Sequence, residues 1–188
     1  MSKITKNAIA DSLIRLMDTK PLPKITISNI TEECGINRMT FYYYFQDIYD
    51  LLRWIISGEI ERIMKDPLPG KGWKEAYTEL CRTAVEHRSM LTNIARSIRR
   101  ERIQGFFNEI TGRYLSNIVE DMTLGLWMPE EKKHFIVDFY KYAIVGLEID
   151  WIEDGMKKPP EIMAEEIAVM VENQLALAIE NFSKAEEK

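Results

Sequence analysis

The sequence predicts an all-α protein with a small N-terminal unit of three helices ahead of a larger helical unit, about nine helices in total. Two observations predict this fold class. Glycine and proline are sparse, at 9 and 7 of 188 residues, whereas Ile, Leu, Met, Glu and Lys are abundant, a mixture that favours helices over turn-rich sheets. Apolar residues also recur with helical spacing, and at 46% of the sequence the hydrophobic residues suffice for a packed core.

The first helix is expected over residues 4–18. Its apolar side chains fall on one face because they follow the helical period: Ile9, Leu13, Leu16 and Met17. Pro21 and Pro23 then end the helix, since proline lacks a backbone N–H and clashes with the preceding turn.

A second, short helix is expected to begin near Ser28, whose hydroxyl can cap it, and to run to Cys34. Gly35 then supplies the left-handed residue that commonly ends a helix. After a tight turn, Asn37 is a good N-cap for a third helix. Two side chains of this helix lie four residues apart and can share a core with the earlier helices: Phe41 and Phe45.

A longer fourth helix is expected to start at a cap on Asp47 and to link two units. The stretch 66–72, with two prolines and two glycines, is the clearest loop in the chain. The helices expected beyond it span residues 73–87, 89–97, 101–126, 129–154 and 159–182. These boundaries predict a helix-turn-helix domain over 1–46 and a helical domain over 47–188, of which 47–65 is the linker helix.

The distribution of charge differs between the two units. Residues 1–46 carry six basic and four acidic groups, which gives a net charge of +2. Because the whole chain has a net charge of −5, the remaining residues have a net charge of −7. A basic N-terminal unit is compatible with nucleic-acid binding. The two cysteines, Cys34 and Cys81, fit apolar helical patterns, so we expect buried thiols in a reducing compartment rather than a disulfide. No signal-peptide pattern or membrane-length apolar run occurs, which predicts a cytoplasmic protein without a membrane partner.

The outward face of the third helix carries the functional signal. A helix, a glycine-containing turn and a second helix form the helix-turn-helix, whose last helix enters the DNA major groove. If Phe41 and Phe45 point inward, the neighbouring residues are left to face outward: Arg38, Met39, Thr40, Tyr42 and Tyr43. An arginine can pair with guanine, apolar groups can meet a thymine methyl, and tyrosine hydroxyls can reach phosphates. Core packing is the alternative for an aromatic stripe, but three consecutive tyrosines cannot all be buried on one face.

The stretch 30–51 reads ITEECGINRMTFYYYFQDIYDL and resembles the signature of the TetR family of transcriptional regulators. Its Gly, Thr, Tyr and Phe occur at the same relative positions as in that signature. The resemblance implies an N-terminal DNA-binding domain, in which Arg38, Met39 and Tyr42 face bases. It places the remaining contacts near the phosphate backbone: Thr26, Ser28, Thr40, Tyr43 and Tyr44.

Two positions depart from the family pattern. Tyr44 replaces a frequent histidine, and Ile48 replaces the lysine that commonly grips a phosphate at the start of the fourth helix. We therefore expect the affinity for DNA to fall less steeply with salt concentration, by about one phosphate contact, unless Lys24 or Lys3 supplies the missing contact.

The last two long helices, about 129–154 and 159–182, are apolar around more than one face, whereas a surface helix needs a single apolar stripe. In the layout that the resemblance implies, these helices from two subunits form a four-helix homodimer interface. Two recognition helices would then read a pseudo-palindromic operator on double-stranded DNA.

The resemblance also implies a cavity between these helices and the linker helix, where an effector would change the tilt of the DNA-binding heads. Aromatic candidates for its lining are Trp73, Tyr77, Phe106, Phe107, Phe139, Tyr140 and Trp151. Simple core packing is the alternative for each of them.

Two further features resemble the branch of the family that regulates dihydroxyacetone kinase operons. They are the pattern Trp54-Ile55-Ile56 and the loop that ends in Gly72-Trp73, before a closing helix that ends near Trp151. In that branch the partner can be a protein co-regulator, which would leave the cavity small or absent.

The sequence contains no phosphate-binding glycine loop, paired-cysteine motif or hydrolase elbow, so no catalytic residue, metal or cofactor is expected. Glu130, His134 and Asp138 share a helical face, but such a face is more often solvated than metal-binding. The leading hypothesis is an effector-responsive regulator, usually a repressor. A DNA-bound adaptor or activator under a protein co-regulator is the second hypothesis, and an enzyme the third.

Overall fold

The computed structural model describes residues 2–65 and 73–184, and within them it contains nine α-helices, one 3-10 helix and no strand. The predicted all-α fold class is confirmed. In chain order the elements are α1 (Ser2–Thr19), η1 (Leu22–Lys24), α2 (Ile27–Cys34), α3 (Arg38–Tyr44), α4 (Ile48–Lys65), α5 (Trp73–Glu86), α6 (Arg88–Ser97), α7 (Arg100–Met122), α8 (Glu130–Glu153) and α9 (Pro160–Lys184). The loop expected over 66–72 lies outside the described residues.

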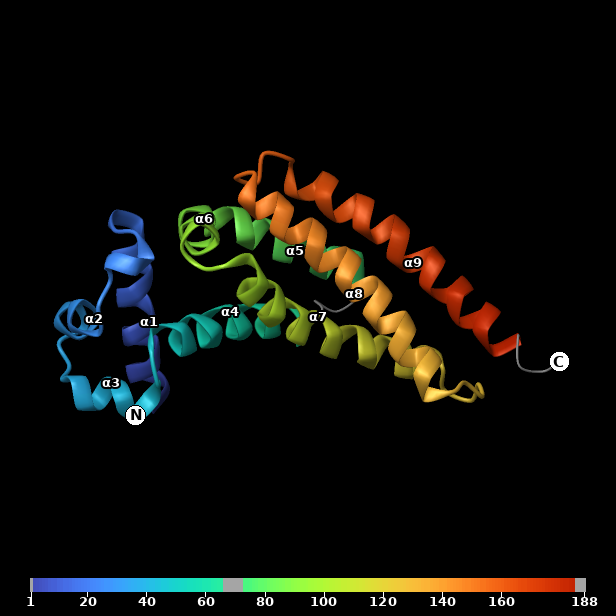
Figure 1. Cartoon of the computed structure of the whole chain (residues 1–188), viewed down its shortest axis with the longest axis horizontal. Helices are drawn as coiled ribbons and strands as arrows, with labels where there is room; N and C mark the ends of the chain where they lie inside the picture. Colours follow the sequence, from blue (N-terminus) through green and yellow to red (C-terminus); the bar gives the residue numbers. More distant parts are fainter. Residues whose placement is uncertain (1, 66–72, 185–188) are drawn as a thin grey trace.

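The helices α1, α2 and α3 form a small head at one end of an elongated molecule, and α4 connects this head to the body (Figure 1). Ile9, Leu13, Ile30 and Phe41 are fully buried in the head, and they belong to a cluster of buried apolar side chains that continues into the body. The body meets the head mainly through α6, which packs against α1 and η1. The head is therefore a compact unit with a defined contact to the body.

In the body, α7 packs against α8 and α5 packs against α9. Figure 1 shows α8 and α9 side by side along one edge of the molecule, running in opposite directions. One surface of this helix pair faces away from the rest of the body.

Most helix boundaries lie within two residues of the sequence-based expectation, and two of the differences have a clear physical cause. The cap of α2 is Thr26 rather than Ser28, because Thr26 combines with Asn29 in a reciprocal capping box. The helix expected to reach residue 126 ends at Met122. Thr123 donates its hydroxyl to the Val119 carbonyl at 2.8 Å, and Gly125 takes a left-handed conformation at φ 79°, which turns the chain away from the helix.

The remaining expectations concern the cysteines and the membrane. Both cysteines are free thiols; Cys81 is buried, as expected, whereas Cys34 is half-buried. Within residues 2–65 and 73–184, no helix has the length and apolar character needed to span a bilayer.

Candidate nucleic-acid interface and body cavity

The helix-turn-helix is fixed by side chains at each of its corners. Thr26 accepts a hydrogen bond from the Asn29 backbone at 3.2 Å and begins α2. Gly35 ends α2 at φ 69°, a left-handed conformation that favours glycine. Asn37 then accepts a hydrogen bond from the Thr40 backbone at 2.8 Å, which confirms it as the N-cap of α3. The sharp entry into α3 is thus determined locally.

Two aromatic side chains anchor α3 and its end to the head. Phe41 is fully buried and Phe45 is 3% exposed, so their expected place in the core is confirmed. Their rings lie 6.0 Å apart, and Trp54 of α4 contacts Phe45 edge-on at 5.7 Å. The Lys6 ammonium lies 5.6 Å from the rings of both Phe45 and Trp54. These contacts fix which face of α3 is turned outward.

The outward face of α3 presents large side chains to solvent. Met39 is 83% exposed, Tyr43 81% and Tyr42 58%. An apolar and aromatic cluster on one short helix is unusual for a surface without a partner. The exposed tyrosines bear out the argument that not all three could be buried.

Arg38 and Ser28 connect the two helices of the motif. The Arg38 guanidinium donates to Ser28 Oγ through Nε at 3.0 Å and also through Nη2. Ser28, which was expected near the DNA backbone, therefore holds the arginine instead of capping α2. Arg38 is exposed and keeps Nη1 available at the start of α3. The hydrogen bonds to Ser28 therefore orient the Arg38 side chain within the protein itself.

The other predicted contact residues have intramolecular partners as well. Thr40 is half-buried and donates its hydroxyl to Asn37 Oδ1 at 3.1 Å. Thr26 donates its hydroxyl to Asn29 Oδ1 at 3.0 Å. Tyr44 is half-buried against the edge of the Tyr43 ring, with ring centres 4.9 Å apart. Contacts from these three side chains to phosphate remain predictions.

The start of α4 differs from the family pattern in a physically clear way. Ile48 is half-buried and packs against the hydrophobic core. Asp47 accepts a hydrogen bond from the Asp50 backbone at 2.8 Å, and Asp50 accepts one from the Gln46 backbone at 3.0 Å. The predicted cap at Asp47 is thereby confirmed. The helix begins with two carboxylates and no cation at position 48.

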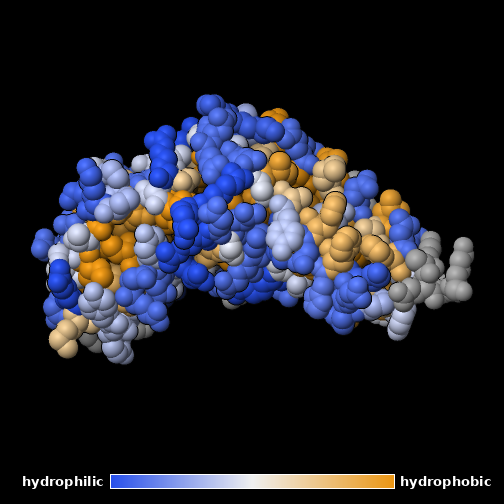
Figure 2. Space-filling model, in the orientation of Figure 1, coloured by the Kyte–Doolittle hydropathy of each residue, from blue (hydrophilic) through white to orange (hydrophobic). Residues whose placement is uncertain are grey.

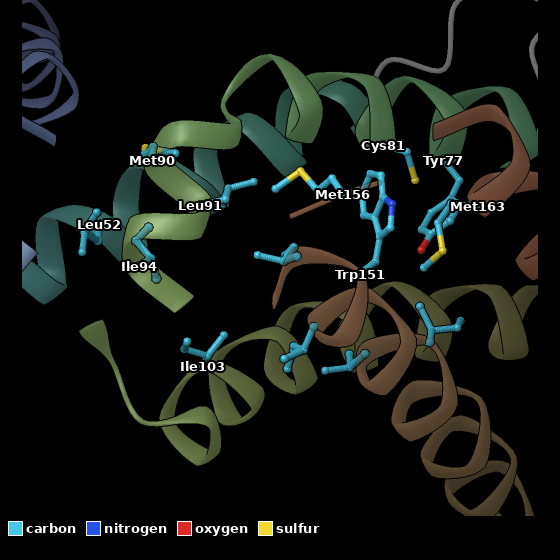
Figure 3. Close-up of a cluster of buried hydrophobic side chains, with 14 of the residues drawn as sticks. Leu52, Tyr77, Cys81, Met90, Leu91, Ile94, Ile103, Trp151, Met156 and Met163 are labelled. Atoms are coloured by element: carbon cyan, nitrogen blue, oxygen red, sulfur yellow. The ribbon is translucent and has the colours of Figure 1, made fainter. Parts of the chain in front are cut away.

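The body contains a mainly apolar cavity of about 280 Å³. Of the aromatic residues predicted to line it, four lie on its wall: Trp73, Tyr77, Phe107 and Trp151. Figure 3 shows Tyr77 and Cys81 on α5 facing Trp151 of α8. The cavity also borders Ile14 of α1, Ile55 of α4 and Leu91 of α6, so it touches both the head and the linker helix.

Three of the predicted lining residues lie elsewhere. Phe106 lines a separate groove between α4 and α7, beneath the guanidinium of Arg53 at 5.4 Å. Phe139 is 62% exposed because it occupies the outer face of α8. Tyr140 is buried beside it but borders neither hollow. Helical periodicity shows which apolar residues share a helix face. It does not show whether that face lines a cavity, packs in the core or forms an interface.

One polar pair stands out on the cavity wall. Tyr77 donates its hydroxyl to Glu148 Oε1 at 2.7 Å. Burial raises the pKa of Glu148 to about 7, although the Tyr77 hydrogen bond acts in the opposite direction. Burial also raises the pKa of the neighbouring Cys81 thiol to about 12. Sequence reasoning missed Glu148, whose signal was an acidic residue within an otherwise apolar stripe of α8.

The outer faces of α8 and α9 are rich in exposed apolar side chains. On α8 they are Phe135, Phe139, Tyr142 and Leu147, and on α9 they are Ile162, Val169, Met170 and Leu177. Each of these side chains is between 48% and 62% exposed. Figure 2 shows apolar side chains on this side of the molecule, over the part that α8 and α9 form.

On the helix face considered for metal binding, the two acidic side chains form ion pairs with lysines. Glu130 pairs with Lys133 at 2.8 Å, and Asp138 pairs with Lys141. His134 is exposed on the same helix. In the described part of the chain, no group of three or more His, Cys, Asp or Glu side chains is arranged to hold a metal ion.

Two family models match this chain, one over its N-terminal part and one over its body. A family model described as bacterial regulatory proteins, tetR family, matches residues 9–55. A second, described as transcriptional regulator C-terminal region, matches residues 71–173. A curated relative, the HTH-type dhaKLM operon transcriptional activator DhaS of Lactococcus lactis, is 33% identical over 86 residues. That match spans less than half of either protein, 46% of this chain and 46% of the relative.

Solved structures extend the likeness over nearly the whole chain. The dihydroxyacetone kinase operon activator DhaS matches with a TM-score of 0.71 and 25% identity, covering 96% of this chain and 98% of the other. NalD of Pseudomonas aeruginosa, the secondary repressor of the MexAB-OprM multidrug efflux pump, matches with a TM-score of 0.55 over 89% of this chain and 94% of its own. NalD is 18% identical and therefore indicates a shared fold alone.

Proposed function

Because the chain belongs to the TetR family of transcriptional regulators, we propose that it binds an operator as a homodimer and that an effector in its body changes its affinity for DNA. The family resemblance noted in the sequence, and the likeness to regulators of dihydroxyacetone kinase operons, are confirmed. The single observation that carries the DNA-binding proposal is the outward face of α3. It exposes Arg38, Met39, Tyr42 and Tyr43 together on a helix fixed by buried phenylalanines.

The proposed contacts follow from the chemistry of that face. Arg38 is held by Ser28 at the first turn of α3, where it can read a guanine. Met39 and Tyr42 project toward bases, and Tyr43 can donate to a phosphate. Thr26, Thr40 and Tyr44 are proposed as phosphate contacts at the edges of the same surface. Under this proposal the DNA-binding domain is residues 1–46, and the second domain, which contains the linker helix and the body, is residues 47–188.

The proposed dimer uses the outer faces of α8 and α9. Many exposed apolar side chains on one side of a protein mark an interaction site more often than a free surface. When the same two helices of a second copy cover these faces, the pair forms a four-helix bundle with two-fold symmetry. Such symmetry presents two copies of α3 to two half-sites of a pseudo-palindrome.

The cavity supports a small-molecule effector as the controlling partner. Its wall includes residues of α1, α4 and α6, the elements that join the head to the body. A ligand that changed the position of these helices would change the tilt of α3. A protein co-regulator, the alternative for this branch of the family, would act without the cavity.

The direction of regulation is open to a direct test. The sequence suggested a repressor, whereas DhaS is named an activator. A reporter placed behind the operator, with and without the regulator gene, distinguishes the two directions.

Selection from random duplex DNA tests the DNA-binding proposal. The purified protein at moderate salt should enrich a pseudo-palindromic sequence. Retention of DNA without any enrichment, or no retention at all, would contradict the proposal.

A further inference from the structure

We infer that the body cavity binds an organic cation, in which an ammonium group pairs with Glu148 and an apolar portion fills the remaining space. This inference rests on the proposed effector role of the cavity and specifies the chemistry of the effector.

Among the described residues of the cavity wall, acidic side chains outnumber basic ones. Among the described residues that line it, the carboxyl groups are those of Glu59 and Glu148, and no lysine or arginine is present. The Glu59 carboxylate is paired with the Arg62 guanidinium, 3.2 Å away at Nε. Glu148 forms no ion pair within the described chain, and its partner is the neutral hydroxyl of Tyr77. The wall therefore offers one carboxyl group whose charge is not compensated.

A carboxylate in apolar surroundings is costly unless a cation approaches it. The accessible surface of Glu148 borders the cavity, so an entering ligand can supply that cation. A neutral or anionic ligand would leave the carboxylate uncompensated or repel it. The charge of the site consequently favours an organic cation over the other ligand classes.

The aromatic residues around Glu148 suit the same ligand. Trp73 and Tyr77 are stacked, with ring centres 5.0 Å apart and planes at 6°, and both lie on the cavity wall. Trp151, which lies on α8, faces Tyr77 of α5 (Figure 3). Aromatic faces attract ammonium groups, most strongly when the cation is desolvated. The site thus combines a carboxyl group with the rings that usually surround bound quaternary ammonium ions.

The pairing predicts that affinity depends on pH. Because the pKa of Glu148 lies at about 7, the carboxyl is mostly protonated at pH 6 and mostly ionised at pH 8. Binding of a permanent cation requires the ionised form, so affinity should rise with pH. The other titratable groups around the cavity are those of Glu59 on α4, Tyr77, Cys81 and His87 on or next to α5, and Tyr114 on α7.

Calorimetric titration of the full chain without DNA tests the inference. The probes are benzyltrimethylammonium and its uncharged isostere neopentylbenzene, which share shape and differ in charge. The wild type should bind the cation about ten-fold more tightly at pH 8 than at pH 6, because that is the change in the ionised fraction of a group with this pKa. Glu148→Gln, which retains size and polarity, should weaken cation binding at pH 8 at least ten-fold and remove its dependence on pH.

Two matched variants locate the effect. Glu59→Gln removes the other carboxyl group of the wall, and His87→Gln removes the imidazole; both should retain the pH profile of the wild type. The inference is overturned if neither probe binds, if neopentylbenzene binds at pH 8 as tightly as the cation, or if Glu148→Gln leaves cation binding unchanged. Since these titrations contain no DNA, their failure leaves the selection of an operator unaffected, and the reverse also holds.

Discussion

The side-chain oxygen of Asn93 on α6 accepts a hydrogen bond from the backbone nitrogen of Leu22 at 2.9 Å. The amide nitrogen of Asn93 donates in turn to the carbonyls of Met17 at 3.0 Å and Lys20 at 2.8 Å. One side chain of the body therefore satisfies three backbone groups where α1 ends and η1 begins. Because Met90 and Leu91 of the same helix line the cavity, α6 links the cavity to the head.

The first prediction concerns this link. Asn93→Ala leaves the three backbone groups without their partner, so it should lower the free energy of unfolding by roughly 1 to 3 kcal/mol, measured by urea denaturation. Thr92→Ala is the matched control, since the Thr92 hydroxyl donates to carbonyls of its own helix, those of Arg88 and Ser89. Equal stability of the two variants would mean that Asn93 does not hold the head.

The second prediction separates base contacts from phosphate contacts. Arg38→Ala should reduce the preference for the selected operator over unrelated DNA by about ten-fold or more, because the hydrogen bonding of its guanidinium to a guanine is lost. Ser28→Ala should produce a smaller effect in the same direction, since it removes the support of the guanidinium. Tyr43→Phe should weaken binding to all sequences alike. Competition binding measures both quantities, and a uniform loss in Arg38→Ala would contradict this assignment.

The third prediction concerns the dimer. Phe139→Glu and Met170→Glu each place a charge on the outer face of α8 or α9, where burial against a second copy would be strongly unfavourable. Sedimentation velocity should show the wild type at twice the chain mass of 22.0 kDa and both variants at the single mass. Met39→Glu, the same kind of change at a more exposed position on α3, should leave the dimer intact and abolish DNA binding. Dimeric Phe139→Glu and Met170→Glu variants would exclude the proposed interface.

The fourth prediction follows from the raised pKa of Glu148. In the unfolded chain the group has its ordinary value of 4.5, and in the fold its pKa is about 7. Between these values the folded state binds the proton more strongly, so stability falls as pH rises from about 4.5 to about 7. The fall contributed by this group is roughly 3 kcal/mol. Glu148→Gln should remove that part of the pH dependence in denaturation curves and be more stable than the wild type at pH 8.

Tyr77→Phe provides the complementary test. The Tyr77 hydroxyl lowers the pKa of Glu148, so its removal should move the transition to higher pH. A wild-type chain whose stability is constant between pH 5 and pH 8 in this comparison would show that Glu148 does not titrate in the fold.

Much of the head could be predicted from the sequence because its determinants are local. Gly35 and Asn37 act on their immediate neighbours, and the four-residue spacing of Phe41 and Phe45 specifies their common buried face. The cap of α2 was assigned to Ser28 instead of Thr26 because both residues can cap, and only the contact with Asn29 distinguishes them.

The body was less predictable because its important contacts join distant segments. Asn93 bonds to residues more than 70 positions earlier, and Tyr77 bonds to Glu148 across 71 positions. No local pattern specifies such pairs. The same reason explains why Phe139 could be recognised as apolar but not as an outward-facing residue of α8.

The most direct test of the central claim is the effect of half-site spacing on binding. Lengthening the spacer of the selected operator by half a helical turn, about 5 base pairs, places the two half-sites on opposite faces of the duplex. A dimer that reads both half-sites through two copies of α3 should then lose at least about ten-fold in affinity, measured by fluorescence anisotropy at fixed salt. Unchanged affinity for the lengthened site would contradict the account.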